Sequence, residues 1–550
     1  MAATYVPPRY EAPPPPAPDQ DERGQEEQGV VVVGAGLVGL TLALDLARAG
    51  IAVTVLDDDD TVATGSRAIC FAKRTLEILG RLGLGGRLLA KGITWKTGRV
   101  FHREREAYAF DLLPEEGHEY PAFVNIQQYY VEDWLVEACA AAGVELRWKH
   151  RVTAVEQASD HAMLAVEAPG GGYRLRAGWV LACDGARSTV REGLGLPFSG
   201  QVFRDRFLIA DVVIQGEVGF PTERWFWFDP PFHPGQSVLL HKQPDDIWRI
   251  DFQLGPEADP EVERRPDRVE ARVRAMLGPD VPFALEWVSV YSFRCRRLER
   301  FRHGRVIFAG DAAHQVSPFG ARGGNGGVQD ADNLAWKLAA VLRGEAPAAL
   351  IDSYEAERIP AAEENILHST RSTDFITPKS PAARAWRDAV LDLAAGHAFA
   401  RPLVNSGRLS RPAVLAESVL GSADDGPWPG GAAAIVGSPA PDAPVMRDGQ
   451  PDWLLRHLGG EFCLLVFDTG WAAWAAGVAG VRTVFVTADE SPGALWDHAG
   501  LAAARFGAPR GGAVLVRPDQ HIAARFAAPS TASVARAVAR ARGHGTGGTP

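Results

Sequence analysis

The chain has 550 residues, which is too long for a single hydrophobic core. Its composition, 46% hydrophobic and 23% charged, is that of a globular protein. Its 68 acidic and 57 basic residues give a net charge of −11, which argues against a nucleic-acid or anionic-membrane partner. The five cysteines form no CxxC pair, and no apolar run approaches the roughly 18–20 residues of a membrane span, so we expect reduced thiols, no bound metal and a cytoplasmic location.

Residues 1–28 are expected to form a disordered leader. Seven prolines lie between Pro7 and Pro18, and a polar, acidic run follows them. Such a segment offers too little apolar surface to offset the loss of chain entropy on folding.

A βαβ unit is predicted directly after this leader. Four consecutive valines at 30–33 are typical of a buried parallel strand. Residues 40–49 have the pattern of a helix, and 52–56 predict a second strand that ends at Asp57.

The turn between the first strand and the helix has the sequence GxGxxG, formed by Gly34, Gly36 and Gly39. These glycines allow a tight turn and a close approach of the backbone to a pyrophosphate, and Asp57 can accept hydrogen bonds from a ribose. A second match at 543–548 follows a helix and precedes none, so we discount it. The first match predicts a dinucleotide-binding domain.

Residues 201–294 have a different character, because short segments rich in Val, Ile, Phe and Trp alternate with turn residues. This pattern predicts a mostly antiparallel sheet that interrupts a Rossmann-like α/β domain. Further α/β sequence follows a linker near the C-terminus. We divide the chain into a first dinucleotide-binding part, a sheet domain that binds substrate, a second dinucleotide-binding part with further helices, a linker and a last α/β domain, at 29–200, 201–294, 295–400, 401–430 and 431–545.

Two later segments narrow the choice of dinucleotide cofactor. The first, at 180–191, contains Asp184, Gly185 and Arg187, and the second, at 306–327, contains Gly310-Asp311 and a run of glycines. With the GxGxxG turn, these motifs occur in an order and spacing that resembles the single-component flavoprotein aromatic hydroxylases, the para-hydroxybenzoate hydroxylase and phenol hydroxylase group. The resemblance covers about residues 29–375, and within the group the chain is most similar to 3-(3-hydroxyphenyl)propionate hydroxylase-like members.

The resemblance implies that the chain binds FAD. Asp311, at the end of a strand, can accept a hydrogen bond from a ribityl hydroxyl, and the glycines after it let backbone N–H groups lie against the flavin. By position, Arg67 corresponds to an arginine that contacts the FAD phosphates, and Gln128 to a glutamine near the ribityl chain. The full set of expected cofactor contacts is Gly34, Gly36, Gly39, Asp57, Arg67, Gln128, Asp184, Gly185, Arg187, Gly310, Asp311, Gly323, Gly324 and Asn325.

The activity that the resemblance implies is NAD(P)H-dependent monooxygenation of a phenolic ring, with O₂ activated as a flavin C4a-hydroperoxide. No separate nicotinamide domain is expected, because NAD(P)H binds transiently in a shared cleft in this group, where Arg187 is implicated. Two alternatives stay open. One is a tailoring monooxygenase that hydroxylates a polycyclic aromatic natural product or inserts oxygen by a Baeyer–Villiger reaction, and the other is a flavin-binding protein without turnover.

The substrate is expected between the sheet domain and the flavin. Along the strand 248–254, alternation places Arg249, Asp251 and Gln253 on one face and Ile250 and Phe252 on the other. The expected partners of the phenolic oxygen are His241, Gln253 and Tyr291. A substrate carboxylate could be held by Arg294 and Arg296, and the backbone from Pro318 to Gly320 is expected over the flavin.

The last domain resembles the thioredoxin-like domain of phenol-hydroxylase-type members, on the segments 437–442, 462–467 and 512–519. Its only cysteine, Cys463, has no CxxC partner, so we expect a buried strand residue and no redox activity. A structural role remains, such as support for a homodimer.

Overall fold

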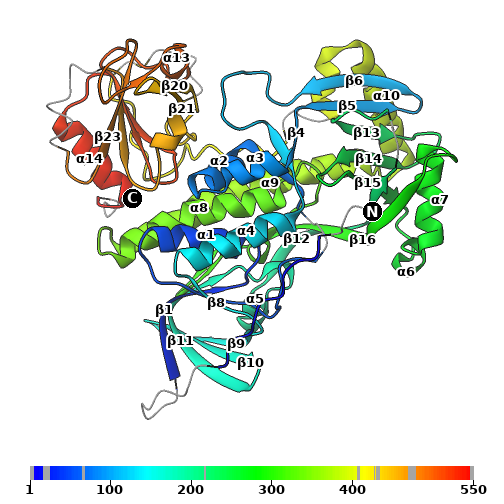
Figure 1. Cartoon of the computed structure of the whole chain (residues 1–550), viewed down its shortest axis with the longest axis horizontal. Coiled ribbons are helices and arrows are strands. Elements are labelled where there is room, and N and C mark those ends of the chain that lie inside the picture. Colours follow the sequence, from blue (N-terminus) through cyan, green and yellow to red (C-terminus); the bar gives the residue numbers. More distant parts are fainter. Residues whose placement is uncertain are drawn as a thin grey trace.

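The computed structural model of the chain (Figure 1) describes residues 5–15, 25–64, 68–215, 219–404, 409–426, 428, 434–468 and 478–545. It contains a large α/β layer, a curved sheet beside it, and a separate α/β domain near the C-terminus, which lies next to one end of the central helices. No helix in the described part of the chain combines the length and apolar character that a membrane span requires.

The α/β layer is built on an eight-stranded sheet whose central strands run parallel, in the order β18-β11-β1-β2-β8. The valines at 30–33 are buried at its centre, as their β-branched run predicts. Antiparallel strands extend the sheet at one edge and flank β11. The strands are β1 (Gln25–Val33), β2 (Thr54–Leu56), β8 (Glu145–Arg147), β9 (Arg151–Gln157), β10 (Ala162–Ala168), β11 (Gly171–Ala182), β17 (Arg302–His303) and β18 (Val306–Phe308).

Three helices lie side by side over this sheet (Figure 1): α1 (Leu37–Arg48), α4 (Gln128–Ala141) and α8 (Gly323–Leu342). Their buried residues and those of the sheet form the largest apolar core of the molecule's described part. Around them lie α2 (Lys73–Arg81), α3 (Gly85–Lys91), α5 (Thr189–Gly193) and α9 (Asp352–Ile376), and a small sheet of β3 (Cys70–Ala72), β4 (Ile93–Trp95) and β7 (Phe123–Asn125).

The second large sheet has the strand order β19-β16-β12-β15-β14-β13-β5-β6 and is mostly antiparallel, with one parallel pair between β13 and β5. Residues 97–111, which the sequence assigned to the dinucleotide-binding part, form two of its strands, because their partner β13 lies far along the chain. The elements are β5 (Thr97–His102), β6 (Arg105–Asp111), β12 (Phe198–Ile214), β13 (Arg224–Phe228), β14 (Ser237–Lys242), β15 (Ile247–Leu254), β16 (Phe283–Leu298), β19 (His314–Gln315), α6 (Pro260–Glu263), α7 (Pro266–Leu277), α10 (Pro381–Gly396) and α11 (Arg401–Val404).

The C-terminal domain has a thioredoxin-like sheet, in which β22 and β23 are parallel and β25 and β26 follow antiparallel beside β22. Cys463 is buried in β22, and all five cysteines are free thiols. The elements are β20 (Pro444–Arg447), β21 (Gln450–Trp453), β22 (Cys463–Val466), β23 (Arg482–Thr487), β24 (Leu495–Trp496), β25 (Ala513–Val516), β26 (Ile522–Phe526), α13 (Leu501–Phe506) and α14 (Thr531–Ala541).

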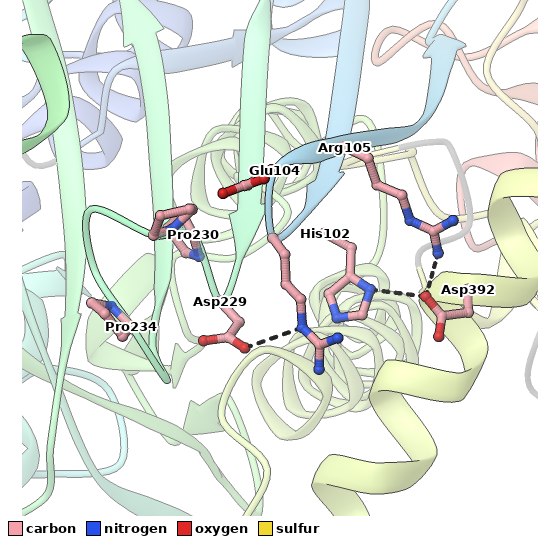
Figure 2. Close-up of a pocket in the computed structure, with 9 residues that line it drawn as sticks. His102, Glu104, Arg105, Asp229, Pro230, Pro234 and Asp392 are labelled. Carbon is pink, nitrogen blue, oxygen red and sulfur yellow. Dashed lines mark hydrogen bonds and ion pairs between the residues drawn. The ribbon is translucent and has the colours of Figure 1, made fainter.

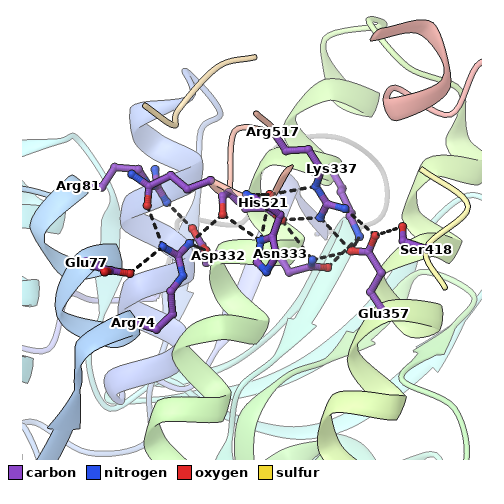
Figure 3. Close-up of polar contacts among 12 residues, drawn as sticks. Arg74, Glu77, Arg81, Asp332, Asn333, Lys337, Glu357, Ser418, Arg517 and His521 are labelled. Atoms are coloured by element: carbon purple, nitrogen blue, oxygen red, sulfur yellow. Dashed lines mark hydrogen bonds and ion pairs between the residues drawn. The ribbon is translucent and has the colours of Figure 1, made fainter. Parts of the chain in front are cut away.

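A buried polar network joins this domain to the central helices (Figure 3). Arg517 donates two hydrogen bonds to the carboxylate of Glu357 on α9, at 2.7 and 2.9 Å, and Lys337 of α8 donates to the same carboxylate at 2.6 Å. Arg74 of α2 donates to the carbonyl oxygen of Asp519 at 2.8 Å. The C-terminal domain is therefore docked through charges that water does not reach.

The structure describes residues 5–15 of the predicted leader. Residues 5–15 are not free of the fold, because Tyr5 and Tyr10 both donate hydrogen bonds to Asp133 on α4 at 2.8 Å. Tyr10 also stacks on Trp148, with ring centroids 4.5 Å apart. The rings of Tyr5 and Tyr10 thus supply apolar contacts that the proline-rich composition did not indicate. The strand β1 likewise begins at Gln25, earlier than the valine run indicates.

Candidate functional site

The GxGxxG turn connects β1 to α1 and is packed too tightly for side chains. Gly34 has φ +105°, and a Cβ atom there would lie 2.5 Å from the carbonyl oxygen of Cys183. A Cβ atom at Gly39 would overlap the carbonyl oxygen of Gly34. Gly36 is the N-cap of α1 and provides no side-chain cap, so the start of this helix offers backbone N–H groups to an anion.

Asp57 directly follows β2 and faces this turn. Its carboxylate accepts hydrogen bonds from the backbone N–H groups of Ala35, at 2.5 Å, and Asp59, at 2.8 Å. Burial raises the pKa of Asp57 to about 6. This position, beside the glycine turn and at the end of the second parallel strand, is where an acid can accept from the hydroxyls of a ribose.

The start of α4 also reaches the turn. Gln128 accepts a hydrogen bond from the N–H of Ala68 at 2.9 Å and donates one to Glu132 at 2.7 Å. Glu132 is buried and accepts from the N–H of Leu37, in the first turn of α1, at 3.0 Å. Sequence reasoning did not select Glu132, although an acid four residues after Gln128 on a helix with an otherwise apolar buried face was a usable signal. The predicted Arg67 lies outside the described residues.

The Asp-Gly segment follows the neighbouring strand β11. Asp184 accepts a hydrogen bond from the N–H of Val190 at 3.0 Å, and burial raises the pKa of its carboxyl group. Gly185 begins a short 3-10 turn that ends at Arg187, whose side chain is exposed. This segment therefore forms part of the same sheet edge, with Arg187 at its surface.

The Gly-Asp segment follows β18 at the same edge. The N–H of Gly310 donates to the buried carboxylate of Asp330 at 3.0 Å, and that carboxylate also contacts His314 Nε2 at 2.6 Å and Arg358 Nε at 2.7 Å. Asp311, the next residue, is exposed. Asp330 was not predicted, because its role depends on α8 and α9 meeting behind the turn.

The glycines that open α8 lie close to the start of α1. A Cβ atom at Gly324 would lie 3.2 Å from the Cβ of Ala68 and 3.4 Å from Cδ2 of Leu37, and one at Gly323 would lie 4.0 Å from Oδ1 of Asp311. The side-chain amide of Asn325 is bonded to backbone atoms of β3. It accepts from the N–H of Ala72 at 2.9 Å and donates to the carbonyl of Cys70 at 2.8 Å.

Four predicted positions, Gly34, Asp57, Asp184 and Asp311, thus follow four neighbouring strands at the carboxyl edge of one parallel sheet. This is the edge at which open α/β sheets bind nucleotides. The turn without side chains, the helix start and the carboxylates have the chemistry that FAD requires, namely space and N–H groups for a pyrophosphate and acceptors for hydroxyls. The described residues therefore fit this cofactor.

The second sheet presents a polar and aromatic inner face. Its register aligns Arg224, His241, Arg249 and Asp211 across four adjacent strands, with Asp251 in the next row. Gln253 and Tyr291 follow one row further, on either side of Phe207. The predicted alternation along β15 is confirmed, since Ile250 and Phe252 lie in an apolar cluster on the other face, with Val269 and Val273 of α7.

His241 is buried at the centre of this face. Its Nε2 lies 3.5 Å from Oδ2 of Asp251, and its Nδ1 lies 3.9 Å from Sγ of Cys70 on β3. Burial lowers the pKa of His241 to about 4, so the imidazole is neutral at physiological pH. Cys70 connects His241 to the start of α8, because its thiol lies beside the His241 ring and its backbone carbonyl accepts a hydrogen bond from Asn325.

Arg224 is the most informative residue that sequence reasoning missed. Its side chain is buried, and within the described residues it has no carboxylate at ion-pair distance. Its Nε has no hydrogen-bond partner there, and its NH1 lies 3.6 Å from Sγ of Cys70. The neighbouring Arg249, by contrast, is paired with Asp211 through two hydrogen bonds of 2.7 Å.

The other candidates have more ordinary surroundings. The side-chain oxygen of Gln253 accepts from the N–H of Ser237 at 3.0 Å. Tyr291 packs against Phe207 and Phe293, and burial raises its pKa well above the usual value. Arg296 donates to Gln315 at 3.0 Å, and Arg294 is exposed.

The loop from Pro318 to Gly320 joins the two halves of the site. Phe319 between them is buried and meets Phe207 and Phe293 edge-on, with ring centroids 5.0 and 5.4 Å apart. The loop therefore connects the start of α8 to the inner face of the second sheet. The structure brings His241, Gln253, Tyr291 and this loop to one side of that sheet.

A separate surface cavity of about 570 Å³ lies at the far end of the second sheet, where β5 and β6 meet α10 (Figure 2). His102 Nδ1 contacts Asp392 there at 3.1 Å, Arg105 bonds the same carboxylate, and proline side chains line the opposite wall. None of the predicted site residues lines this cavity.

Comparisons with known proteins agree with this geometry. The family described as "FAD binding domain" matches residues 27–369, and the family described as "Aromatic-ring hydroxylase, C-terminal" matches residues 433–544. The 6-methylpretetramide 4-monooxygenase of Streptomyces rimosus is 35% identical over 530 residues, which cover 90% of each chain.

A 3-(3-hydroxy-phenyl)propionate/3-hydroxycinnamic acid hydroxylase of Mycolicibacterium gilvum is 32% identical over 67% of this chain and 64% of its own. A solved structure of aklavinone-11 hydroxylase with FAD and aklavinone is similar with a TM-score of 0.74 and 25% identity, over 94% of this chain and 99% of that one. Both the FAD-binding and the C-terminal parts of the fold are therefore accounted for, and the chain belongs to the family of FAD-dependent aromatic monooxygenases.

Proposed function

We propose that this monooxygenase hydroxylates the ring of a fused-ring phenol, with NAD(P)H as reductant and O₂ as the source of oxygen. The observation that carries the proposal is the buried Arg224, which lies beside the His241–Asp251 pair and lacks a carboxylate partner among the described residues. A buried guanidinium without a counter-ion is costly, and a phenolate oxygen would satisfy it.

FAD supplies the redox chemistry when it is bound and reduced, since it activates dioxygen for transfer to the ring. The chain's own residues prepare the phenol. Asp251 accepts the hydrogen bond of the phenolic hydroxyl, and Arg224 stabilises the negative charge that develops on the oxygen. Because a phenolate ring is richer in electrons than a phenol ring, this polarisation favours attack on an electrophilic oxygen.

The size of the substrate is inferred from the relatives and from the inner face. A relative that matches 90% of the chain is named for 6-methylpretetramide, and a structural neighbour holds aklavinone, both of them fused-ring compounds. Aromatic side chains extend along the face from the polar row, and these can stack on several rings. They are Phe207, Phe226, Tyr291, Phe293 and Phe319.

A single-ring phenol is the second candidate. Its support is the 32% identity to the 3-(3-hydroxy-phenyl)propionate/3-hydroxycinnamic acid hydroxylase over 67% of this chain. The shorter share of the chain covered by that relative makes this candidate the weaker one.

The test uses purified protein with its flavin and two panels of substrates, one of fused-ring phenols and one of single-ring phenols. NADH and NADPH consumption is followed with each, and products are identified by mass spectrometry. The proposal expects a hydroxylated product and stimulated reductant consumption with a fused-ring phenol. Stimulation by single-ring phenols alone would favour the second candidate, and a lactone product would identify a Baeyer–Villiger enzyme.

A further inference from the structure

Residues 5–15 form an arm that lies across the outside of α4 and the loop after β2. The arm is fixed to α4 by both tyrosines, because the hydroxyl of Tyr5 donates to Oδ2 of Asp133 and that of Tyr10 donates to Oδ1, each at 2.8 Å. Tyr5 also stacks on Tyr129, with ring centroids 4.7 Å apart and planes 8° from parallel. One carboxylate on α4 therefore holds two points of the arm.

The arm also pairs with the loop that follows Asp57. The N–H of Tyr10 donates to the carbonyl of Asp60 at 2.7 Å, and Arg9 forms an isolated antiparallel bridge with Thr61. The guanidinium of Arg9 donates to both oxygens of Asp60, at 2.8 and 2.9 Å. The loop thus gains a strand-like neighbour on its exposed side.

A third connection passes through His150. Its Nε2 contacts the carbonyl oxygen of Pro13 at 3.0 Å, so the imidazole is tied to the arm. Its backbone N–H donates to the carbonyl of Asp57 at 2.8 Å. His150 therefore contacts both the arm and the backbone of Asp57, the acid expected to bind the ribose.

The arm contacts α4 and the loop after β2, and these two elements form the adenosine side of the expected FAD site. Asp133 follows Glu132, whose carboxylate accepts from the N–H of Leu37 at the start of α1. Asp60 is three residues after Asp57, whose carboxylate accepts from Ala35 in the glycine turn. Relative movement of α4 and the loop would displace both carboxylates, and the arm opposes that movement.

We propose that the arm is a positioning element for the cofactor, which holds α4 and the 57–61 loop in register and so increases affinity for the adenosine half of FAD. It reaches no reacting atom, and its effect is on binding. The proposal rests on FAD binding alone and is independent of the substrate.

The experiment compares Tyr10→Ala with Tyr10→Phe and with Arg174→Ala in the full chain. Tyr10→Ala removes the stack on Trp148 and the bond to Asp133, and Tyr10→Phe keeps the stack. We expect FAD dissociation constants, measured by flavin fluorescence on the apoprotein, to rise about tenfold for Tyr10→Ala and less for Tyr10→Phe. Arg174→Ala, which removes an exposed ion pair with Glu156 away from the arm, is the matched control and should change little.

ADP serves as the second probe, since it is the adenosine half of FAD. The proposal expects ADP to lose affinity for Tyr10→Ala by the same factor as FAD, with the far-ultraviolet spectrum and the melting of the C-terminal domain unchanged. If FAD and ADP bind Tyr10→Ala as tightly as wild type while the apoprotein melts at a lower temperature, the arm is only structural and the proposal is wrong. Should Tyr10→Ala fail to fold, Asp133→Asn provides the same comparison.

Discussion

Among single residues, both halves of the site contain charged side chains that the fold largely removes from water. Asp57 and Arg224 are the clearest cases, one in each half of the site. Each has few partners that belong to the chain, and each is expected to gain one from a ligand. Their substitution should therefore separate cofactor binding from substrate binding.

Asp57→Asn tests the cofactor half of the site, through the pH dependence of the free energy of unfolding. Burial raises the folded-state pKa of Asp57 to about 6 from 3.8, so the folded apoprotein holds this proton more tightly than the unfolded chain. Its contribution to stability consequently falls as pH rises from about 4 to about 6 and is constant above that range. The free energy of unfolding of Asp57→Asn, minus that of wild type, should increase by about 2 kcal/mol between pH 4 and pH 7.

The measurement is chemical denaturation of the two apoproteins across that range. A constant offset from the changed hydrogen bonds does not affect the slope of the difference. A difference that stays flat with pH would show that Asp57 is not titrating near 6.

Arg224→Gln tests the second half. Because the guanidinium is expected to stabilise a developing phenolate, kcat/KM for the phenolic substrate should fall by about 10²-fold. FAD content should not change, since Arg224 contacts no residue of the glycine turn. Arg296→Gln is the control, as it lies on the same sheet but donates to Gln315 at the edge. Equal losses in the two variants would remove Arg224 from its assigned role.

Local sequence was enough to place some of these residues and not others. Gly34, Gly39 and Asp57 were predictable because the turn that needs them is contiguous and its strand–turn–helix context is visible in the chain. Arg224 and Asp330 were not, since each acquires its role from an element more than fifteen residues away. The backbone hydrogen bonds of the Gln253 and Asn325 side chains were not predictable either, because their partners lie on neighbouring strands.

At the scale of elements, the first turn of α8 is the joint between the two halves of the site. Asn325 secures it by accepting from Ala72 and donating to Cys70, both on β3. The glycine run was expected to lie against the flavin, and in the structure it forms the beginning of a helix that is bonded to a strand.

Asn325→Ala should therefore loosen this joint. It leaves a buried N–H and a buried carbonyl without partners, and we expect a loss of about 2–4 kcal/mol in the free energy of unfolding. Asn365→Ala is a suitable comparison, since its side-chain contact with Arg322 is long, at 3.5 Å. Thermal and chemical denaturation of the holoproteins check the prediction, and similar stability of the two variants would contradict it.

The sequence did not predict that β5 and β6 belong to the second sheet. The strands β5 and β6 look like part of the first domain, yet they close the second sheet through the parallel pairing of β5 with β13. Periodicity reports that a segment is a strand and which face is apolar, but it does not report the partner strand.

At the scale of the whole molecule, the C-terminal domain is fixed to the FAD domain through Glu357. This carboxylate receives hydrogen bonds from Arg517 and Lys337, and the pKa of Glu357 lies well below its usual range, because the attraction of these cations outweighs the effect of burial (Figure 3). The resemblance to thioredoxin-like domains predicted the fold of the appendage. It did not predict this interface, which pairs residues from three distant segments.

Glu357→Gln should destabilise the protein by about 3–5 kcal/mol, because it leaves buried cations without a full counter-charge. Glu363→Gln on the same helix is the control, since its ion pair with Arg297 is largely exposed and should be worth at most about 1 kcal/mol. Denaturation followed separately by flavin and by tryptophan fluorescence would report whether the domains come apart. Equal effects of the two substitutions would contradict the importance of the interface.

We propose that the chain transfers one atom of dioxygen to the ring of a fused-ring phenol. The most direct test is turnover of such a phenol by the flavin-loaded protein, with NADH or NADPH, under isotope-labelled dioxygen. The account predicts a ring-hydroxylated product that carries one labelled oxygen atom, with formation that depends on Arg224. Reductant consumption that yields only hydrogen peroxide across the panel, or a product whose new oxygen is unlabelled, would contradict it.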